Sequence, residues 1–145
     1  MTGNNQPRPN ISASTTIAPE FCDLDPMSVV WHGNHVRYLE AARRVLLEKI
    51  GYSYQDMKDS GYAWPVVDLR LRYYRPLRLG QQIEIRAAIT EWENRLKMTY
   101  QITDRASGAK LARGHTVQVA VDLKTEEMLW QTPPVLHAKL APYLR

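Results

Sequence analysis

The sequence contains a single cysteine, Cys22, among its 145 residues. An intrachain disulfide and a cysteine-based metal site are therefore impossible, which fits the reducing environment of the cytoplasm. No run of apolar residues approaches the length of a membrane-spanning helix, and the first ten residues lack the apolar stretch of a signal peptide. We therefore expect a cytoplasmic protein with no integral membrane contact.

The excess of positive charge is also small. The chain has 19 Lys and Arg against 15 Asp and Glu, a net charge of +4. These residues form no recognisable nucleic-acid-binding motif, so we expect no nucleic-acid partner. A mild positive balance suits a small anionic ligand equally well.

What is present fits one compact domain. Hydrophobic residues make up 44% of the chain and charged residues 23%, and no repeat or interior linker divides it. Residues 1–11 are mostly polar and read as a disordered tail. Residues 12–145 form the predicted domain.

The spacing of apolar residues predicts the elements of this domain. The loosely alternating segment 12–22 predicts a first strand, and helical spacing predicts a long helix over 34–50 and a shorter one over 54–60. From residue 67 onward the period is two, which predicts four more strands in a meander. One long helix against a curved antiparallel sheet of about five strands is an α+β architecture.

The predicted sheet has faces and edges that need cover. We expect the long helix to cover the apolar face formed by Val67, Leu69, Leu71 and Tyr73. An exposed sheet edge invites unwanted pairing, and symmetric pairing of two copies removes that liability. We therefore expect a homodimer, or a homotetramer built from two dimers.

One segment carries a specific motif. It reads Asp23-Leu24-Asp25-Pro26-Met27-Ser28-Val29-Val30-Trp31-His32-Gly33-Asn34-His35, followed by Tyr38, Glu40 and Arg43. This resembles the signature of the 4-hydroxybenzoyl-CoA thioesterase family, and the resemblance extends over about residues 18–122. It implies a single hotdog domain that hydrolyses an acyl-CoA or acyl-carrier-protein thioester without a cofactor.

The resemblance assigns roles to residues of this loop. It makes Asp25 the catalytic carboxylate, acting as nucleophile or as general base, and it places an oxyanion site at the backbone of His32 and Gly33. A turn-forming aspartate and a plain helix cap are the simpler readings of these residues. The family has Gly where this chain has Ser28, which matters if that position needs a positive φ.

Other residues are candidates for a supporting role. Glu40 is the fallback catalytic residue, since a different branch of hotdog proteins uses a helix carboxylate; an ordinary ion pair with Arg44, or with Arg43, would explain it as well. His32 and His35 also suggest a metal pair, but two histidines three residues apart are a weak signal, and we expect no metal. The candidate substrate-binding residues are Trp31, Asn34, Tyr54, Trp64, Arg70, Arg72 and Arg75. The arginines would bind phosphates, although a solvated strand face explains Arg70 and Arg72 equally well.

Two alternatives to a thioesterase remain from the sequence. One is a non-catalytic acyl-binding hotdog protein, which the presence of Asp25 argues against. The other is a hotdog dehydratase, whose paired histidine and acid we do not find. The chain length of the acyl group and the choice between CoA and carrier protein cannot be read from the residues.

Overall fold

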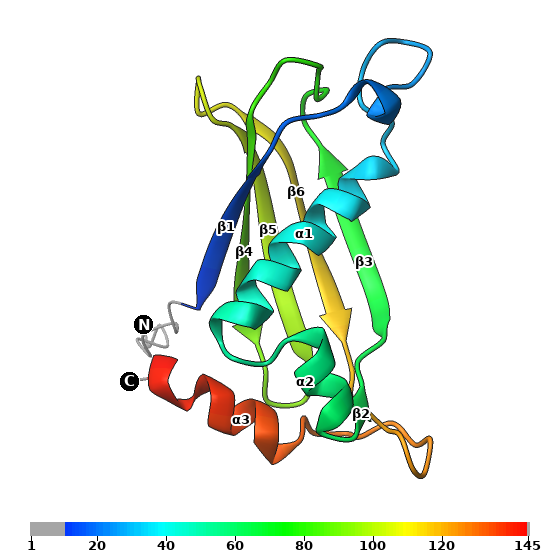
Figure 1. Cartoon of the computed structure of the whole chain (residues 1–145), viewed down its shortest axis with the longest axis vertical. Coiled ribbons are helices and arrows are strands. Elements are labelled where there is room, and N and C mark those ends of the chain that lie inside the picture. The colour runs from blue at the N-terminus through cyan, green and yellow to red at the C-terminus, as the bar shows by residue number, and fades with distance from the viewer. Residues whose placement is uncertain (1–10, 145) are drawn as a thin grey trace, which may run out of the picture.

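A computed structural model describes residues 11–144 as an antiparallel five-stranded sheet with one long helix lying across it (Figure 1). In chain order the elements are β1 (Ser12–Ile17), the 3-10 turn η1 (Phe21–Asp23), α1 (Asn34–Lys49), α2 (Tyr54–Asp59), β2 (Tyr62–Ala63), β3 (Val66–Tyr73), β4 (Ile83–Glu91), β5 (Leu96–Asp104), β6 (Lys110–Gln118), β7 (Val121–Asp122), α3 (Pro134–Leu140) and η2 (Ala141–Tyr143). The expected α+β architecture is confirmed. Of the segment assigned to the tail, only Ile11 lies within the described residues, and it is buried in the core.

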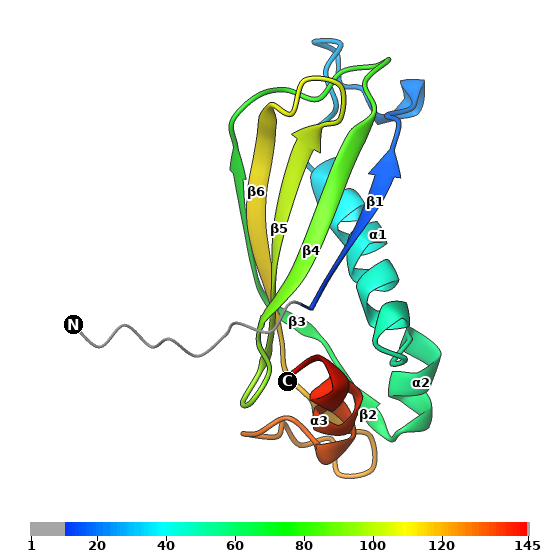
Figure 2. The ribbon, with the colours of Figure 1, turned by 90° about the vertical axis from the view of Figure 1, so that its left-hand side faces the viewer.

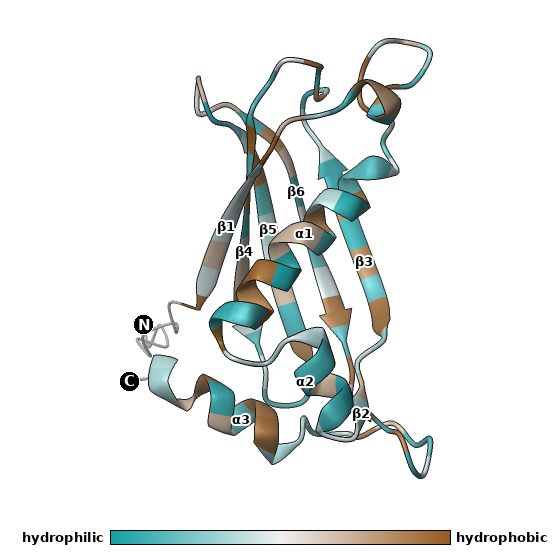
Figure 3. Cartoon of the chain, in the orientation of Figure 1, coloured by the Kyte–Doolittle hydropathy of each residue, from teal (hydrophilic) through white to brown (hydrophobic). Residues whose placement is uncertain are grey.

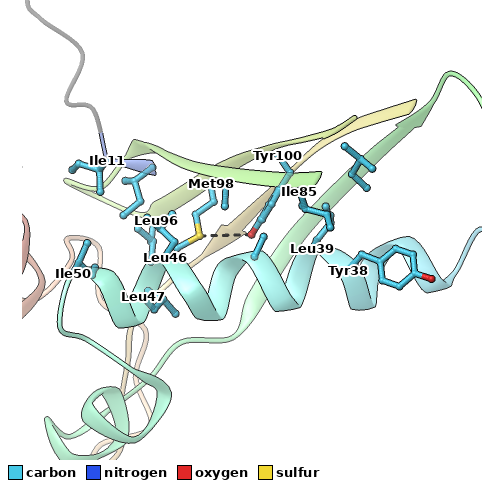
Figure 4. Packing of buried hydrophobic residues seen from close by; sticks show 14 of the residues in the cluster. Ile11, Tyr38, Leu39, Leu46, Leu47, Ile50, Ile85, Leu96, Met98 and Tyr100 are labelled. Atoms are coloured by element: carbon cyan, nitrogen blue, oxygen red, sulfur yellow. Dashed lines mark hydrogen bonds between the residues drawn. The ribbon is translucent and has the colours of Figure 1, made fainter. Parts of the chain in front are cut away.

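The long helix α1 packs one side against the sheet. Its inward residues recur at helical spacing, and they meet inward residues of β4 and β5 (Figure 4). Leu39 and Leu46 of α1 lie toward the strands and belong to one buried cluster with Ile85 of β4 and with Leu96, Met98 and Tyr100 of β5. Each such side chain contributes about 1.5–3 kcal/mol when it is fully buried. Figure 2 shows that α1 covers one face of the sheet, while no helix of the described chain lies against the opposite face.

The order of the strands corrects part of the sequence prediction. The meander of β4, β5 and β6 is confirmed, but β3 does not pair with β4. It lies beside β6 instead, which gives the order β1-β4-β5-β6-β3. The connection from β3 to β4 crosses the end of the sheet, where Pro76 has no N–H for a strand ladder and Leu77 is buried. The carbonyl of Leu77 accepts a hydrogen bond from the Val30 N–H at 2.8 Å.

The position of β3 at the edge overturns a second expectation. The helix α1 does not cover the apolar face of β3, because α1 packs mainly on β1 and β4, toward the opposite edge of the sheet. Val67 is 58% exposed, Leu69 40% and Tyr73 45%, and only Leu71 packs against the core. Hydrophilic and hydrophobic residues alternate along this exposed strand (Figure 3). The strand β3 is therefore an open edge with apolar side chains on it.

Candidate active site

Asp23 fixes the loop that leads into α1. Its side chain is buried, and its Oδ2 accepts hydrogen bonds from the Tyr38 hydroxyl at 2.7 Å and the Glu20 N–H at 3.0 Å. Its Oδ1 forms an ion pair with Arg37. Burial alone would raise the pKa of Asp23, but these hydrogen bonds and the guanidinium charge bring it below its ordinary value. A buried carboxylate bound on both oxygens is suited to holding the loop rather than to reacting.

Asp25 differs from Asp23 both in its burial and in the hydrogen bonding of its carboxylate. It is only half-buried, and its Oδ1 accepts hydrogen bonds from the N–H groups of Met27 at 2.8 Å and Val29 at 3.4 Å. Within residues 11–144, its Oδ2 makes no hydrogen bond. The loop closes on itself through Ser28, whose φ of 62° is left-handed. The family's glycine would adopt this conformation without strain. Ser28 is strained at the same φ, and the loop needs this left-handed residue to close.

Asp25 opens onto a groove between the loop and the end of β3. The groove has a volume of about 320 Å³ and is lined by Asp25, Val29, Val30, His32, His35, Tyr73, Tyr74, Arg75 and Pro76. The loop before α1 and the end of β3 lie at the same end of the molecule, as Figure 1 shows. A carboxylate oxygen without a partner therefore stands in a groove large enough to hold part of a small molecule.

The start of α1 forms one wall of this groove. Within the described chain, the N–H groups of His32 and Gly33 make no hydrogen bond, whereas the His32 carbonyl accepts one from the Tyr73 hydroxyl at 2.8 Å. The Trp31 ring lies against Gly33, where an added Cβ would come within 2.3 Å of a ring carbon. Trp31 therefore occupies the space left by the missing side chain of Gly33.

His35, which the sequence suggested only as half of a weak metal pair, is part of the groove lining. Its imidazole is buried and lies edge-on to the Tyr73 ring, with 4.6 Å between the ring centroids. Neither ring nitrogen has a hydrogen-bond partner in the described structure. Burial lowers the pKa of His35, which favours the neutral imidazole. Tyr73 was also missed, because its place in the alternating strand marked it only as a core residue.

Two of the candidate substrate-binding residues lie beside the loop. The Asn34 side chain donates a hydrogen bond to the Asp23 carbonyl at 2.8 Å, and the same carbonyl accepts the Trp31 N–H at 2.9 Å. Asn34 therefore ties the start of α1 to the loop. The Trp31 side chain is half exposed and stands next to His32, with 5.2 Å between their ring centroids.

Tyr54, Trp64 and Glu40 are not among the residues that line the Asp25 groove. Trp64 is buried in the core, and its indole N–H donates to the Tyr52 hydroxyl at 3.3 Å. Glu40 accepts a hydrogen bond from the Tyr54 hydroxyl at 3.1 Å and pairs with Arg43. The ion-pair partner of Glu40 is therefore the buried Arg43. Arg44 forms no ion pair in residues 11–144.

The structure separates the three candidate arginines. Arg75 lines the Asp25 groove, whereas Arg70 and Arg72 line a second cavity, on the face of the sheet opposite α1. Tyr74 lines both cavities and stands between them.

Residues 11–144 contain neither a cluster of metal-binding side chains nor a membrane-spanning helix. No three His, Cys, Asp or Glu side chains gather closely enough to hold a metal ion. No helix is long and apolar enough to cross a membrane.

Comparison with known proteins agrees with the fold and with the motif. A Synechocystis protein named "Putative esterase sll0410" is 36% identical over 113 residues, which cover 77% of this chain and 68% of that protein. The Escherichia coli acyl-CoA thioester hydrolase YbgC is 29% identical over 100 residues, which cover 69% of this chain and 75% of YbgC. A crystal structure of a 4-hydroxybenzoyl CoA thioesterase variant with 4-hydroxybenzoyl CoA superposes with a TM-score of 0.77 at 20% identity, covering 89% of this chain and 98% of that one.

The family assignment rests on most of the chain. The family model described as the Thioesterase-like superfamily matches residues 19–140, which include the loop, α1 and the whole sheet except β1. The expected hotdog fold and the expected enzyme class, a thioester hydrolase, are thereby confirmed at the level of the family. This chain belongs to the Thioesterase-like superfamily.

Proposed function

We propose that this protein hydrolyses acyl-CoA thioesters, with Asp25 as the catalytic carboxylate. The observation that carries the proposal is the contrast between the two aspartates of the loop. Asp23 is buried and bound on both oxygens, whereas Asp25 lines the groove and has Oδ2 free of hydrogen bonds within the described residues. The name of YbgC, an acyl-CoA thioester hydrolase, supports the choice of substrate class.

The reaction needs a group that attacks the thioester carbonyl or activates water. Asp25 can do either: as a base it takes a proton from water while the water oxygen bonds to the carbonyl carbon, and as a nucleophile it forms a mixed anhydride that water then cleaves. In both routes the C–S bond breaks, the thiolate leaves and takes up a proton, and the products are an acid and a thiol. The N–H groups that fix Oδ1 hold the carboxylate in one orientation for this step.

The developing negative charge on the carbonyl oxygen needs hydrogen-bond donors. The N–H groups of His32 and Gly33 stand at the start of α1, where the helix dipole favours negative charge. The hydrogen bond from Tyr73 to the His32 carbonyl orients this peptide. Arg75, in the same groove, is suited to hold an anionic group of the substrate.

The test is release of free thiol from a panel of acyl-CoA and acyl-carrier-protein thioesters. We expect Asp25→Asn to lower kcat by roughly 10²–10⁴-fold with little change in thermal stability, because the amide oxygen can still accept the two loop N–H groups. Asp59→Asn makes the same chemical change at an exposed position of α2 and should have no effect. Activity within about tenfold of wild type in Asp25→Asn would refute the assignment. Tight binding of acyl-CoA without thiol release would instead indicate an acyl-binding protein.

We further propose that two copies pair along β3 into a two-fold dimer. The strand is an open edge with Val67, Leu69 and Tyr73 exposed, and Tyr73 is also part of the Asp25 groove. A partner strand would bury these side chains and bring a second chain to the mouth of the groove.

The dimer can be tested by sedimentation equilibrium, which also separates a dimer from a tetramer. Leu69→Lys places a charge on the proposed interface and should shift the protein toward a monomer of low activity. Thr16→Lys makes a comparable change on the other edge strand, β1, and should leave the assembly unchanged. A fully active wild-type monomer at assay concentration would exclude the proposal.

A further inference from the structure

Among the polar side chains that line the Asp25 groove, only that of His35 is buried, with 2% of the residue exposed. Neither Nδ1 nor Nε2 of its imidazole has a hydrogen-bond partner within residues 11–144. A buried polar atom without a partner costs free energy, and each such atom in a native protein calls for an explanation. The groove beside the ring is where a molecule from outside the chain can reach these nitrogens.

The backbone beside the ring does not supply the partner. The carbonyl groups of Trp31 and His32 lie close enough to His35 to oppose part of the lowering of its pKa by burial, but neither accepts a hydrogen bond from the ring. The Trp31 carbonyl already accepts the Asn34 N–H at 2.9 Å. The His32 carbonyl already accepts the Tyr73 hydroxyl at 2.8 Å. Both nitrogens of the imidazole are therefore left without a partner in the described part of the folded chain.

Two tyrosine rings hold the imidazole in place. The Tyr73 ring meets His35 edge-on, with 4.6 Å between the ring centroids, and the Tyr38 ring lies at 6.4 Å. The hydroxyl groups of both tyrosines have other partners. Tyr38 donates to the Asp23 carboxylate at 2.7 Å, and Tyr73 donates to the His32 carbonyl. The two rings restrict the orientation of His35 without satisfying its nitrogens, which suits a preorganised binding residue.

The charge state of His35 decides what it can bind. Burial lowers its pKa, so the imidazole is neutral near pH 7. A neutral imidazole has one N–H donor and one nitrogen acceptor, whereas an anion needs donors only. A metal ion would need further ligands, and the chain between residues 11 and 144 gathers no set of three. The best match is a neutral group that itself carries a donor and an acceptor, such as a hydroxyl or a secondary amide.

We propose that His35 is a substrate-recognition residue, which binds a hydroxyl or an amide group of the thioester. This role rests on the proposed function, since it takes the Asp25 groove as the place of the substrate. Other residues of the groove suit other parts of a substrate: Val29 and Val30 are apolar, and Arg75 suits an anion. A substrate without a hydroxyl or amide would leave both ring nitrogens unpaired, and a site of this kind discriminates against it.

Two parts of a thioester substrate carry such a group. One is a hydroxyl on the acyl chain, close to the thioester carbonyl. The other is the first amide of the thiol arm, which CoA and acyl-carrier-protein thioesters share. Three thioesters separate these sources: an acyl-N-acetylcysteamine thioester has the amide alone, its 3-hydroxyacyl analogue has both groups, and the S-butyl thioester of the plain acid has neither. The acyl length is the one that gives the fastest thiol release in the panel of acyl-CoA thioesters.

The measurement is kcat/KM of the wild type, His35→Phe and His35→Gln with these three substrates. Phenylalanine keeps a ring and removes both nitrogens, whereas glutamine keeps a donor and an acceptor and is the matched control. If the amide is recognised, His35→Phe lowers kcat/KM at least about tenfold for both N-acetylcysteamine thioesters, mainly through KM, and not for the S-butyl thioester. If the hydroxyl is recognised, only the 3-hydroxyacyl substrate suffers this loss. His35→Gln should retain most of the wild type's preference.

Urea unfolding at pH 8 separates recognition from a structural role. His35→Phe removes two unpartnered buried atoms, so its free energy of unfolding should be no lower than that of the wild type. Unchanged kcat/KM in His35→Phe, or an equal loss for all three substrates, overturns the proposal. So does a wild type that hydrolyses the three substrates with equal kcat/KM, a test that requires no variant to fold. Thiol release from none of the thioesters refutes the proposed function, whereas release without discrimination refutes only the role of His35.

Discussion

The buried carboxylate of Asp23 allows the two aspartates of the loop to be separated by experiment. Asp23→Asn keeps the size of the side chain and removes its charge. One amide oxygen can still accept the hydrogen bonds from the Tyr38 hydroxyl and the Glu20 N–H, while the amide NH₂ then faces the Arg37 guanidinium. The substitution therefore turns two charge-assisted bonds into neutral ones and abolishes an ion pair.

The expected loss of stability follows from these contacts. Hydrogen bonds to charged groups contribute about 1.5–3 kcal/mol and neutral ones about 1, so the two bonds together lose on the order of 2 kcal/mol. The ion pair adds little, because the Arg37 side chain is 58% exposed and can turn to water. In a chain of this length a loss of that size lowers Tm by roughly 4–8 °C.

Urea unfolding and calorimetry measure this loss, with Arg37→Gln as the control that should cost less than about 1 kcal/mol. The pKa of Asp23 is lowered in the folded protein, so its contribution is complete above the ordinary value of 3.8 and is lost as the pH falls below it. The difference between wild type and Asp23→Asn should shrink over that acid range. A variant as stable as the wild type but catalytically dead would refute the structural role and make Asp23 a catalytic residue.

Three further predictions concern the same region. Ser28→Gly should leave kcat unchanged and raise the free energy of unfolding by up to about 1 kcal/mol, because relief of left-handed strain outweighs the greater freedom of glycine in the unfolded chain; a fall in stability would show that the serine is not strained. Gly33→Ala should displace the Trp31 ring and change tryptophan fluorescence, and it should have little effect on stability in a Trp31→Ala background, where the clash is gone. Burial lowers the pKa of His35 below its ordinary value of 6.5, so the unfolded chain takes up a proton before the folded one and stability falls as the pH drops below 6.5. His35→Phe should reduce this fall between about pH 7 and pH 5 in urea unfolding, and an unchanged slope would mean that His35 becomes charged in the folded state.

The sequence was sufficient for the elements of the fold but not for the place of β3. Helical spacing located α1 to within a residue, and the period of two located β4, β5 and β6. The same period in β3 gave no sign that the strand lies next to β6, since alternation records which side chains share a face and not which strand is the neighbour. Val67 and Leu69 are exposed because β3 lies at the edge of the sheet, beside β6. Alternation alone predicts both of them to be core residues.

The parts of the candidate site that lie close together in the sequence could be predicted. The parts that strand pairing brings together could not. Asp25 and the start of α1 lie within one stretch of sequence, so a motif can point to both. Tyr73 and Arg75 reach the same groove from the end of β3, far along the chain. Lys97 and Arg113 could not be linked to Arg72 at all, because only the register of β5, β6 and β3 brings them to one cavity.

The pairing of β1 with β4 affects how the chain reaches its native state. Ser12 lies beside Ala88 and Ile17 beside Ile83, so the first strand to be synthesised must wait for one of the middle strands. Contacts between such distant residues slow folding, because a long loop must close before any of them forms. During synthesis α1 emerges after β1 but before the other four strands of its sheet, so most of the surface on which its apolar side packs is still missing. We therefore expect folding of this domain to take place after β6 has left the ribosome, in a single slow step.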